Sequence, residues 1–191
     1  MITALREQAR GRVEIHLDDR PWRVVPADAV VRAGLAVGRA LDRDAARTLA
    51  RELRRAEALK AAAGVLRHRD VSRRRLDERL ERRGVRADAR RDALATLERA
   101  GLVDDARVAE GRARSLAGRG YGDAAIRFAL EDDGVDEEHV AAALAALEPE
   151  RERAARLLGG GAGDVKALRR LAAKGFDAET LAELTAFADD G

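Results

Sequence analysis

The sequence of 191 residues contains no cysteine, which excludes disulfide frameworks, thiolate zinc sites and cysteine nucleophiles. It has no apolar run near the roughly 20 residues that a membrane-spanning helix needs. The first twelve residues lack the apolar stretch and cleavage site of a secretory signal. We therefore expect a cytoplasmic protein without membrane contact. Only three prolines and five aromatic residues are present, which argues against a β-rich fold.

Lysine is also scarce, because arginine supplies 34 of the 37 basic residues. The formal net charge is only +2, but the charges are unevenly distributed. Residues 1–122 carry 29 basic and 19 acidic side chains, whereas residues 123–191 carry 8 basic and 16 acidic ones. A basic half is typical of a protein that binds a polyanion, and an acidic half indicates a different role.

The first 26 residues differ from the rest in their periodicity. Apolar and polar residues alternate over 13–17 and again over 22–24, on either side of a polar break at 18–21. This pattern predicts a β-hairpin, which needs a packing partner because a lone hairpin is marginally stable. We expect a short helix at 28–32 and a longer helix with Asp42 as its N-cap.

A pattern that recurs three times organises the remainder of the chain: a leucine, three residues, a glycine and an apolar residue. The glycine fits the left-handed position that ends a helix, and the next residue folds back onto that helix. A further apolar helix follows each time, and the spacing leaves room for a third helix at about 57–69, 104–117 and 150–158. The three copies are Leu80-x-x-x-Gly84-Val85, Leu130-x-x-x-Gly134-Val135 and Leu171-x-x-x-Gly175-Phe176.

These repeats predict an all-α fold of three tandem three-helix repeats in an elongated, solenoid-like arrangement, with a small N-terminal β-hairpin region. Ser72 is the expected N-cap of one helix, and Asp104 or Asp105 of another. Gly159–Gly163 is expected to be a flexible joint. The expected divisions are 1–55 for the hairpin and its helices, 56–101 for the first repeat, 102–148 for the second and 149–191 for the third.

No motif in the sequence predicts catalysis. His68-Arg69-Asp70 superficially matches a protein-kinase catalytic loop, but Arg75 stands where that motif requires asparagine. The glycine-rich stretches lack the Gly-Lys-Ser/Thr of a phosphate-binding loop. The three histidines lie in separate segments, with no spacing suited to a metal. We therefore expect a protein that is not an enzyme and that holds no metal or cofactor.

The strongest functional signal is a run of eleven arginines between Arg67 and Arg91. Arg75, Arg79 and Arg82 share one face of the helix expected after Ser72, an arrangement that suits a phosphate backbone. The alternative is a solvated face whose charge interleaved acidic residues partly neutralise. The candidate contacts are Arg67, Arg73, Arg74, Arg75, Arg79, Arg82, Arg83, Arg112, Arg114, Arg119, Tyr121 and Arg127.

The central segment resembles the signature of the RecX regulatory family. The resemblance is strongest over residues 65–148 and extends to the first and third copies of the repeat. The sequence departs from the family at Val108, where an aromatic residue is usual, and at 131–133, which is commonly basic. The resemblance is carried by Gly101-Leu102-Val103-Asp104-Asp105, Arg119-Gly120-Tyr121-Gly122 and Ile126-x-x-x-Leu130-x-x-x-Gly134-Val135.

What the resemblance implies is a helical regulator of the RecA recombinase. Such a protein binds the RecA filament on single-stranded DNA and inhibits ATP hydrolysis, strand exchange and the SOS response, without catalytic residues of its own. On this basis we expect a monomer whose partners are the RecA filament and single-stranded DNA, with double-stranded DNA left open. The alternatives are a general nucleic-acid-binding helical protein without a recombinase partner, and a helical scaffold that binds only proteins.

Overall fold

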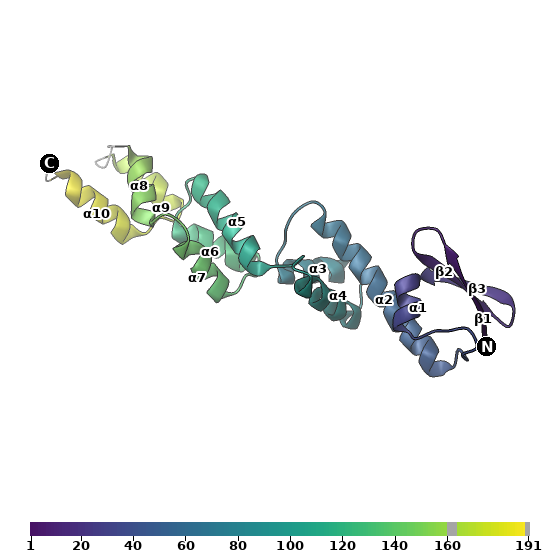
Figure 1. The fold of residues 1–191 in the computed structure, drawn as a ribbon. Helices are drawn as coiled ribbons and strands as arrows, with labels where there is room; N and C mark the ends of the chain where they lie inside the picture. Colours follow the sequence, from purple (N-terminus) through teal and green to yellow (C-terminus); the bar gives the residue numbers. More distant parts are fainter. Residues whose placement is uncertain (160–163, 190–191) are drawn as a thin grey trace. The chain divides into compact units, whose positions relative to one another are not determined.

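The computed structural model describes residues 1–159 and 164–189, which form a mostly helical fold with one small antiparallel sheet (Figure 1). The predicted helical class with a small N-terminal β region is confirmed. The strands are β1 (Ile2–Gln8), β2 (Arg12–Leu17) and β3 (Arg20–Pro26). The helices are α1 (Ala27–Arg32), α2 (Arg43–Leu66), α3 (Arg73–Arg82), α4 (Ala87–Arg99), α5 (Asp105–Gly118), α6 (Asp123–Asp132), α7 (Glu137–Ala145), α8 (Glu150–Leu158), α9 (Val165–Ala173) and α10 (Ala178–Asp189).

The N-terminal sheet has three strands, in the order β1-β2-β3, rather than the two of the predicted hairpin. The predicted hairpin is formed by β2 and β3, and its turn consists of Asp18 and Asp19. Both aspartates have positive φ (47° and 65°), as the type I′ turns that suit twisted hairpins require. Arg20 and Pro21, expected in the turn, lie in β3. The alternation does not predict β1, because Ile2 alone among its residues is fully buried.

The sheet is stabilised by packing against α1 and the first half of α2 (Figure 1). Ile2, Ile15 and Val25 of the sheet are at most 1% exposed and belong to one apolar cluster with Val30 of α1 and Leu49 of α2. This cluster provides the packing partner that the hairpin was expected to need.

Helix α2 is longer than predicted. Asp42 is its N-cap, as predicted, and the carboxylate accepts a hydrogen bond from the amide of Ala45 at 2.8 Å. The helix then continues without interruption to Leu66, so the expectation of a separate helix at 57–69 is wrong. Neither glycine nor proline interrupts residues 43–63, and nothing therefore ends the helix at the expected boundary between residues 55 and 56.

The three repeated glycines end their helices as predicted. Gly84, Gly134 and Gly175 have φ of +75°, +81° and +82°. In each copy the amide of the following apolar residue donates to the carbonyl of the leucine four residues before the glycine, at 3.1, 3.1 and 3.2 Å. This is the Schellman arrangement, in which a left-handed residue satisfies carbonyls that the helix leaves unpaired.

The helices pack in groups that follow the repeat. The group α5–α7 surrounds Ala109, Ile126, Leu130 and Val140, all fully buried. The group α8–α10 has a smaller core that includes Phe176. In the first copy α2 packs against α4 through small buried alanines. Residues 160–163 of the expected flexible joint lie outside the described residues.

The chain forms two compact units. One comprises Met1–Arg69 and Leu76–Leu102, and the other comprises Asp70–Arg75 and the chain from Val103 onward. Their boundary passes through α3, whose first turn belongs to the second unit.

Gly122 provides a test of the packing in the second unit. A Cβ at Gly122 would lie 2.3 Å from the carbonyl oxygen of Gly175, whereas a Cβ at Gly118 would meet nothing within 4 Å. We expect Gly122→Ala to lower the free energy of unfolding by about 1–3 kcal/mol or more, because backbone cannot easily move aside. Gly118→Ala, the matched control, should be neutral or slightly stabilising. Chemical denaturation measures both, and equal stability of the two variants would contradict the close packing.

Candidate nucleic-acid interface

A basic hollow lies beside the C-terminal end of α2, within the first unit. Its volume is about 280 Å³. We call it the arginine hollow. It is lined by Gly64, Val65, His68, Arg69, Arg79, Arg82 and Arg83.

Local structure brings these side chains together. Arg79 and Arg82 lie three residues apart in the last turn of α3, so they project from neighbouring positions, and Arg83 follows directly after the helix. His68 and Arg69 lie in the segment that leaves α2. The guanidinium of Arg83 also donates to the carbonyl of Ala61 in α2 at 3.2 Å. That bond places a cation near the C-terminal end of α2, where the helix dipole favours positive charge.

The electrostatics of the hollow favour an anion. Its lining contains four arginines and one histidine but no acidic residue. Over residues 1–159 and 164–189, neither Arg69 nor Arg82 makes an ion pair, and both side chains are exposed. Guanidinium groups present forked donors that match phosphate oxygens. The arrangement can therefore bind a phosphate group.

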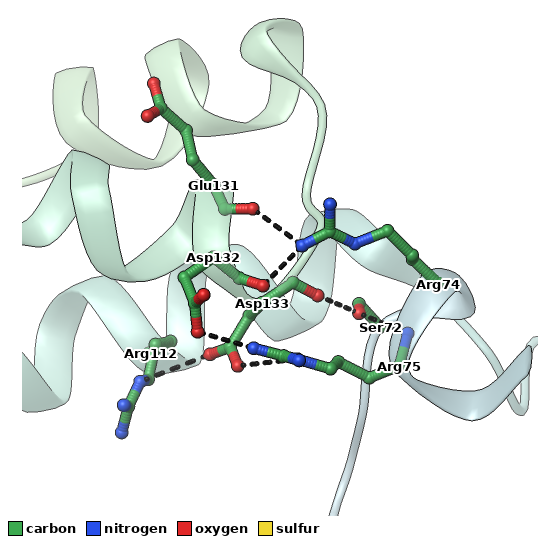
Figure 2. A network of polar contacts seen from close by, with 7 residues as sticks. All are labelled: Ser72, Arg74, Arg75, Arg112, Glu131, Asp132 and Asp133. Atoms are coloured by element: carbon green, nitrogen blue, oxygen red, sulfur yellow. Dashed lines mark hydrogen bonds and ion pairs between the residues drawn. The ribbon is translucent and has the colours of Figure 1, made fainter. Parts of the chain in front are cut away.

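Three other predicted contacts surround the C-terminal end of α6 instead (Figure 2). Arg74 donates to the main-chain carbonyls of Glu131, at 3.0 Å, and Asp132. Arg75 pairs with the carboxylates of Asp132 and Asp133, and Arg112 of α5 approaches Asp133 at 3.6 Å. We call these six residues the α6-terminus network.

The first turn of α3 also contacts the C-terminal end of α6. Ser72 is its N-cap, as predicted, because the hydroxyl accepts from the amide of Arg75 at 3.2 Å while donating to the carbonyl of Asp133. Asp105 accepts from the amide of Arg73 at 2.8 Å. Asp104 rather than Asp105 caps α5, through the amide of Arg107 at 3.0 Å. The departure from the family pattern at 131–133 is therefore part of an internal network with Arg74, Arg75 and Arg112.

The remaining predicted residues are scattered over the second unit, apart from Arg67, which ends α2 and is exposed. Arg114 pairs with Glu110 at 3.7 Å, on an exposed face of α5. Tyr121 is half-buried, with the cations of Arg119 and Lys174 over its ring at 5.4 and 5.5 Å. This ring packs locally and is less available for stacking.

Arg127 of α6 forms an ion pair with Glu137 of α7. The hydrogen bond to that carboxylate raises the pKa of Arg127 above the ordinary arginine value, because it stabilises the charged form. Among the candidate residues, Arg79, Arg82 and Arg83 thus line the arginine hollow, whereas Arg75, Arg112, Arg114 and Arg127 pair with carboxylates elsewhere in the fold.

Among the polar residues of the hollow, His68 and Arg69 are absent from the predicted contacts. The signal that points to them is their position in the arginine run, immediately before the N-cap Ser72. Only the meeting of the α2 end with the last turn of α3 shows that they face Arg79 and Arg82.

Similarity to known proteins decides the family. Residues 104–144 match the family model described as RecX, second three-helix domain, a segment that covers nearly all of α5–α7. The regulatory protein RecX of Stenotrophomonas maltophilia (strain R551-3) is 36% identical over 139 residues, which cover 68% of this chain and 85% of that protein. The chain belongs to the RecX family.

Other RecX proteins extend the comparison. The one from Xanthomonas oryzae pv. oryzae (strain MAFF 311018) is 36% identical over 136 residues, covering 66% of this chain and 85% of its own. A crystal structure of regulatory protein RecX has a TM-score of 0.84 at 20% identity, covering 97% of this chain and 98% of that one. RecX from Lactobacillus salivarius has a TM-score of 0.62 at 19% identity, covering 72% and 98%. These two structures support the RecX fold.

The name that these relatives share describes regulation rather than a chemical reaction. Among residues 1–159 and 164–189, no helix is both long and apolar enough to cross a bilayer. In the same part of the chain, no three acidic or histidine side chains gather in a way that would hold a metal ion.

Arg75 and Arg82 provide a test of the division between paired and exposed arginines. Arg75→Ala should lower the free energy of unfolding by about 1 kcal/mol, because Asp132 and Asp133 lose a charged donor. Arg82→Ala, with no ion pair to lose, should stay within about 0.5 kcal/mol of the parent. Thermal unfolding measures both changes. Equal stability of the two variants would show that the α6-terminus network does not contribute.

Proposed function

We propose that this RecX-family chain is a non-enzymatic negative regulator of the RecA recombinase, acting in the cytoplasm as a monomer. It binds the RecA filament on single-stranded DNA and inhibits ATP hydrolysis, strand exchange and SOS signalling. Family membership supports a regulatory role, and the resemblance of residues 65–148 to the RecX signature supports RecA as the target. The proposed repeats of the chain are 56–101, 102–148 and 149–191.

The arginine hollow is the observation that carries the nucleic-acid part of the proposal. It combines four arginines without an acidic neighbour in its lining, and Arg69 and Arg82 are available for phosphate oxygens. Contacts of this kind position a protein on a nucleic acid without reading its sequence. We therefore expect binding that depends strongly on salt and little on base sequence.

The acidic C-terminal part supports a second contact, with protein. Residues 123–191 carry 16 acidic and 8 basic side chains, and α7 begins with the exposed residues Glu137 and Glu138. A negative surface suits a basic patch on RecA, because complementary potentials steer and orient a complex. Nucleic acid would meet the arginine hollow, and protein would meet this acidic part.

Stoichiometric addition of the chain to RecA filaments on single-stranded DNA should lower the rate of ATP hydrolysis by RecA. The measurement is steady-state ATP hydrolysis at fixed DNA, with and without the chain. An unchanged rate, together with salt-dependent retention of the chain on DNA alone, would favour a general nucleic-acid-binding protein. An unchanged rate without such retention would favour a protein-binding scaffold.

Charge reversal in the hollow tests the DNA contact. Arg69→Glu/Arg82→Glu should weaken binding to single-stranded DNA by tenfold or more. It should also lower the slope of log affinity against log salt by about 1.4, since each phosphate contact contributes about 0.7 on a single strand. Fluorescence anisotropy of a labelled oligonucleotide at several salt concentrations gives both quantities.

The matched control is Arg43→Glu/Arg91→Glu, which reverses two exposed arginines on α2 and α4 that lie outside the hollow. It changes the net charge by the same amount and should leave the salt slope nearly unchanged. Equal losses in the two double variants would assign the effect to overall charge rather than to the hollow.

A further inference from the structure

The only tryptophan of the chain lies on the surface of the N-terminal sheet. Trp22 is 44% exposed, and it belongs to a run of five exposed residues, 20–24, in strand β3. Val24 in the same run is 37% exposed. Tryptophan supplies more apolar area than any other side chain, and a small domain normally buries it. Its exposure, on a sheet whose core is formed by other residues, leaves part of the ring accessible to a ligand.

A β-bulge places Trp22 in this position. Ile15 pairs with Arg23 and His16 pairs with Pro21, so two consecutive residues of β2 face residues of β3 that are two apart. Trp22 is the extra residue and has no partner across the ladder. Bulges change the direction in which side chains project, and they are frequent beside functional sites. The irregularity therefore coincides with the exposed indole.

The charges on strand β3 itself have one sign. Arg20 and Arg23 flank Trp22, both are exposed, and within the described part of the chain neither makes an ion pair. Strand β3 contains no acidic residue. Asp19 precedes Arg20 in the turn and is exposed, while Asp18 pairs with the terminal amine of Met1 at 2.8 Å. The strand itself thus presents an aromatic ring between two arginines.

The same features argue against a partner that adds a β-strand. Within the described residues β3 pairs with β2 alone, so it is an edge strand. Pro21 removes a backbone donor from this edge, and the carbonyl of Val24 accepts from the guanidinium of Arg12 at 3.0 Å. Proline, charged side chains and bulges are the devices that prevent strand addition. Aromatic rings flanked by cations are instead typical of single-strand nucleic-acid binding.

We propose that strand β3 binds single-stranded nucleic acid, with a base stacked on the indole of Trp22 and phosphates held by Arg20 and Arg23. Stacking is tolerant of base identity, because every base has a π-face. The site lies on the sheet, separate in sequence from the arginine hollow. The inference goes beyond the proposed function and does not require RecA.

Because Trp22 is the only tryptophan, the fluorescence excited selectively at tryptophan reports on this one site in the whole chain. Titration of the full chain with oligo(dT), without RecA, should quench that fluorescence. An abasic strand of the same length should bind with little quenching, since it offers phosphates but no base. Unchanged fluorescence on saturation with oligo(dT), or equal quenching by the abasic strand, would overturn the proposal.

Substitutions separate stacking from folding. Trp22→Ala should weaken oligo(dT) binding by roughly 5- to 150-fold, the range that corresponds to 1–3 kcal/mol per stacked base, whereas Trp22→Phe should retain most of the affinity. Val31→Ala, at a residue 76% exposed on α1, is the matched control and should bind like the parent. Binding by Trp22→Ala equal to that of the parent would overturn the proposal.

The salt dependence of binding tests the contribution of Arg20 and Arg23 separately. Arg20→Gln/Arg23→Gln should lower the salt slope of oligo(dT) binding by about 1.4, and circular dichroism should show an unchanged fold. A fluorescence change that appears only when RecA protein is added, and not with oligo(dT), would assign Trp22 to a protein contact and overturn the proposal. Failure of the ATP hydrolysis test leaves this result unaffected, because RecA is absent from the binding titration.

Discussion

The architecture depends on one local arrangement, a helix that ends at a left-handed glycine and is followed by an apolar residue that returns to the helix. At Gly84, Gly134 and Gly175 it satisfies carbonyls that a short helix would otherwise leave unpaired. It also sets the direction in which the next helix leaves. Because α6, α7 and α9 have only nine or ten residues, they are too short to be stable alone. Their cores form only when these turns bring them together.

The arginines of this chain serve two purposes that composition does not separate. Arg74, Arg75 and Arg112 join the end of α6 to neighbouring segments, where they neutralise a helix C-terminus and its carboxylates (Figure 2). Arg69 and Arg82 instead line the arginine hollow, whose lining contains no acidic residue. The first group stabilises the fold, and the second gives the surface a positive electrostatic potential. A low net charge is therefore compatible with a strongly basic local site.

Features that depend on neighbouring residues were predictable from the sequence. The glycine turns, the N-caps Asp42 and Ser72, and the hairpin all follow from short patterns, and the N-cap of α5 was narrowed to Asp104 or Asp105. The partners of Arg75 were not predictable, because Asp132 lies 57 residues away and only tertiary packing brings it close. Strand β1 was missed because only Ile2 of its residues is fully buried, so its sequence lacks the alternating pattern that marks β2 and β3. The hollow likewise requires α2 to meet α3, which no local pattern specifies.

The uninterrupted course of α2 has a consequence for distances. Leu49 packs in the core beneath the sheet, and Val65 lines the arginine hollow. Sixteen residues of one helix separate them, which corresponds to about 24 Å at 1.5 Å per residue. Helix α2 therefore fixes the separation between the core beneath the sheet and the arginine hollow, both within the first unit. If one nucleic-acid strand occupies both proposed sites, it must exceed a minimum length, and affinity should then rise in a step with oligonucleotide length.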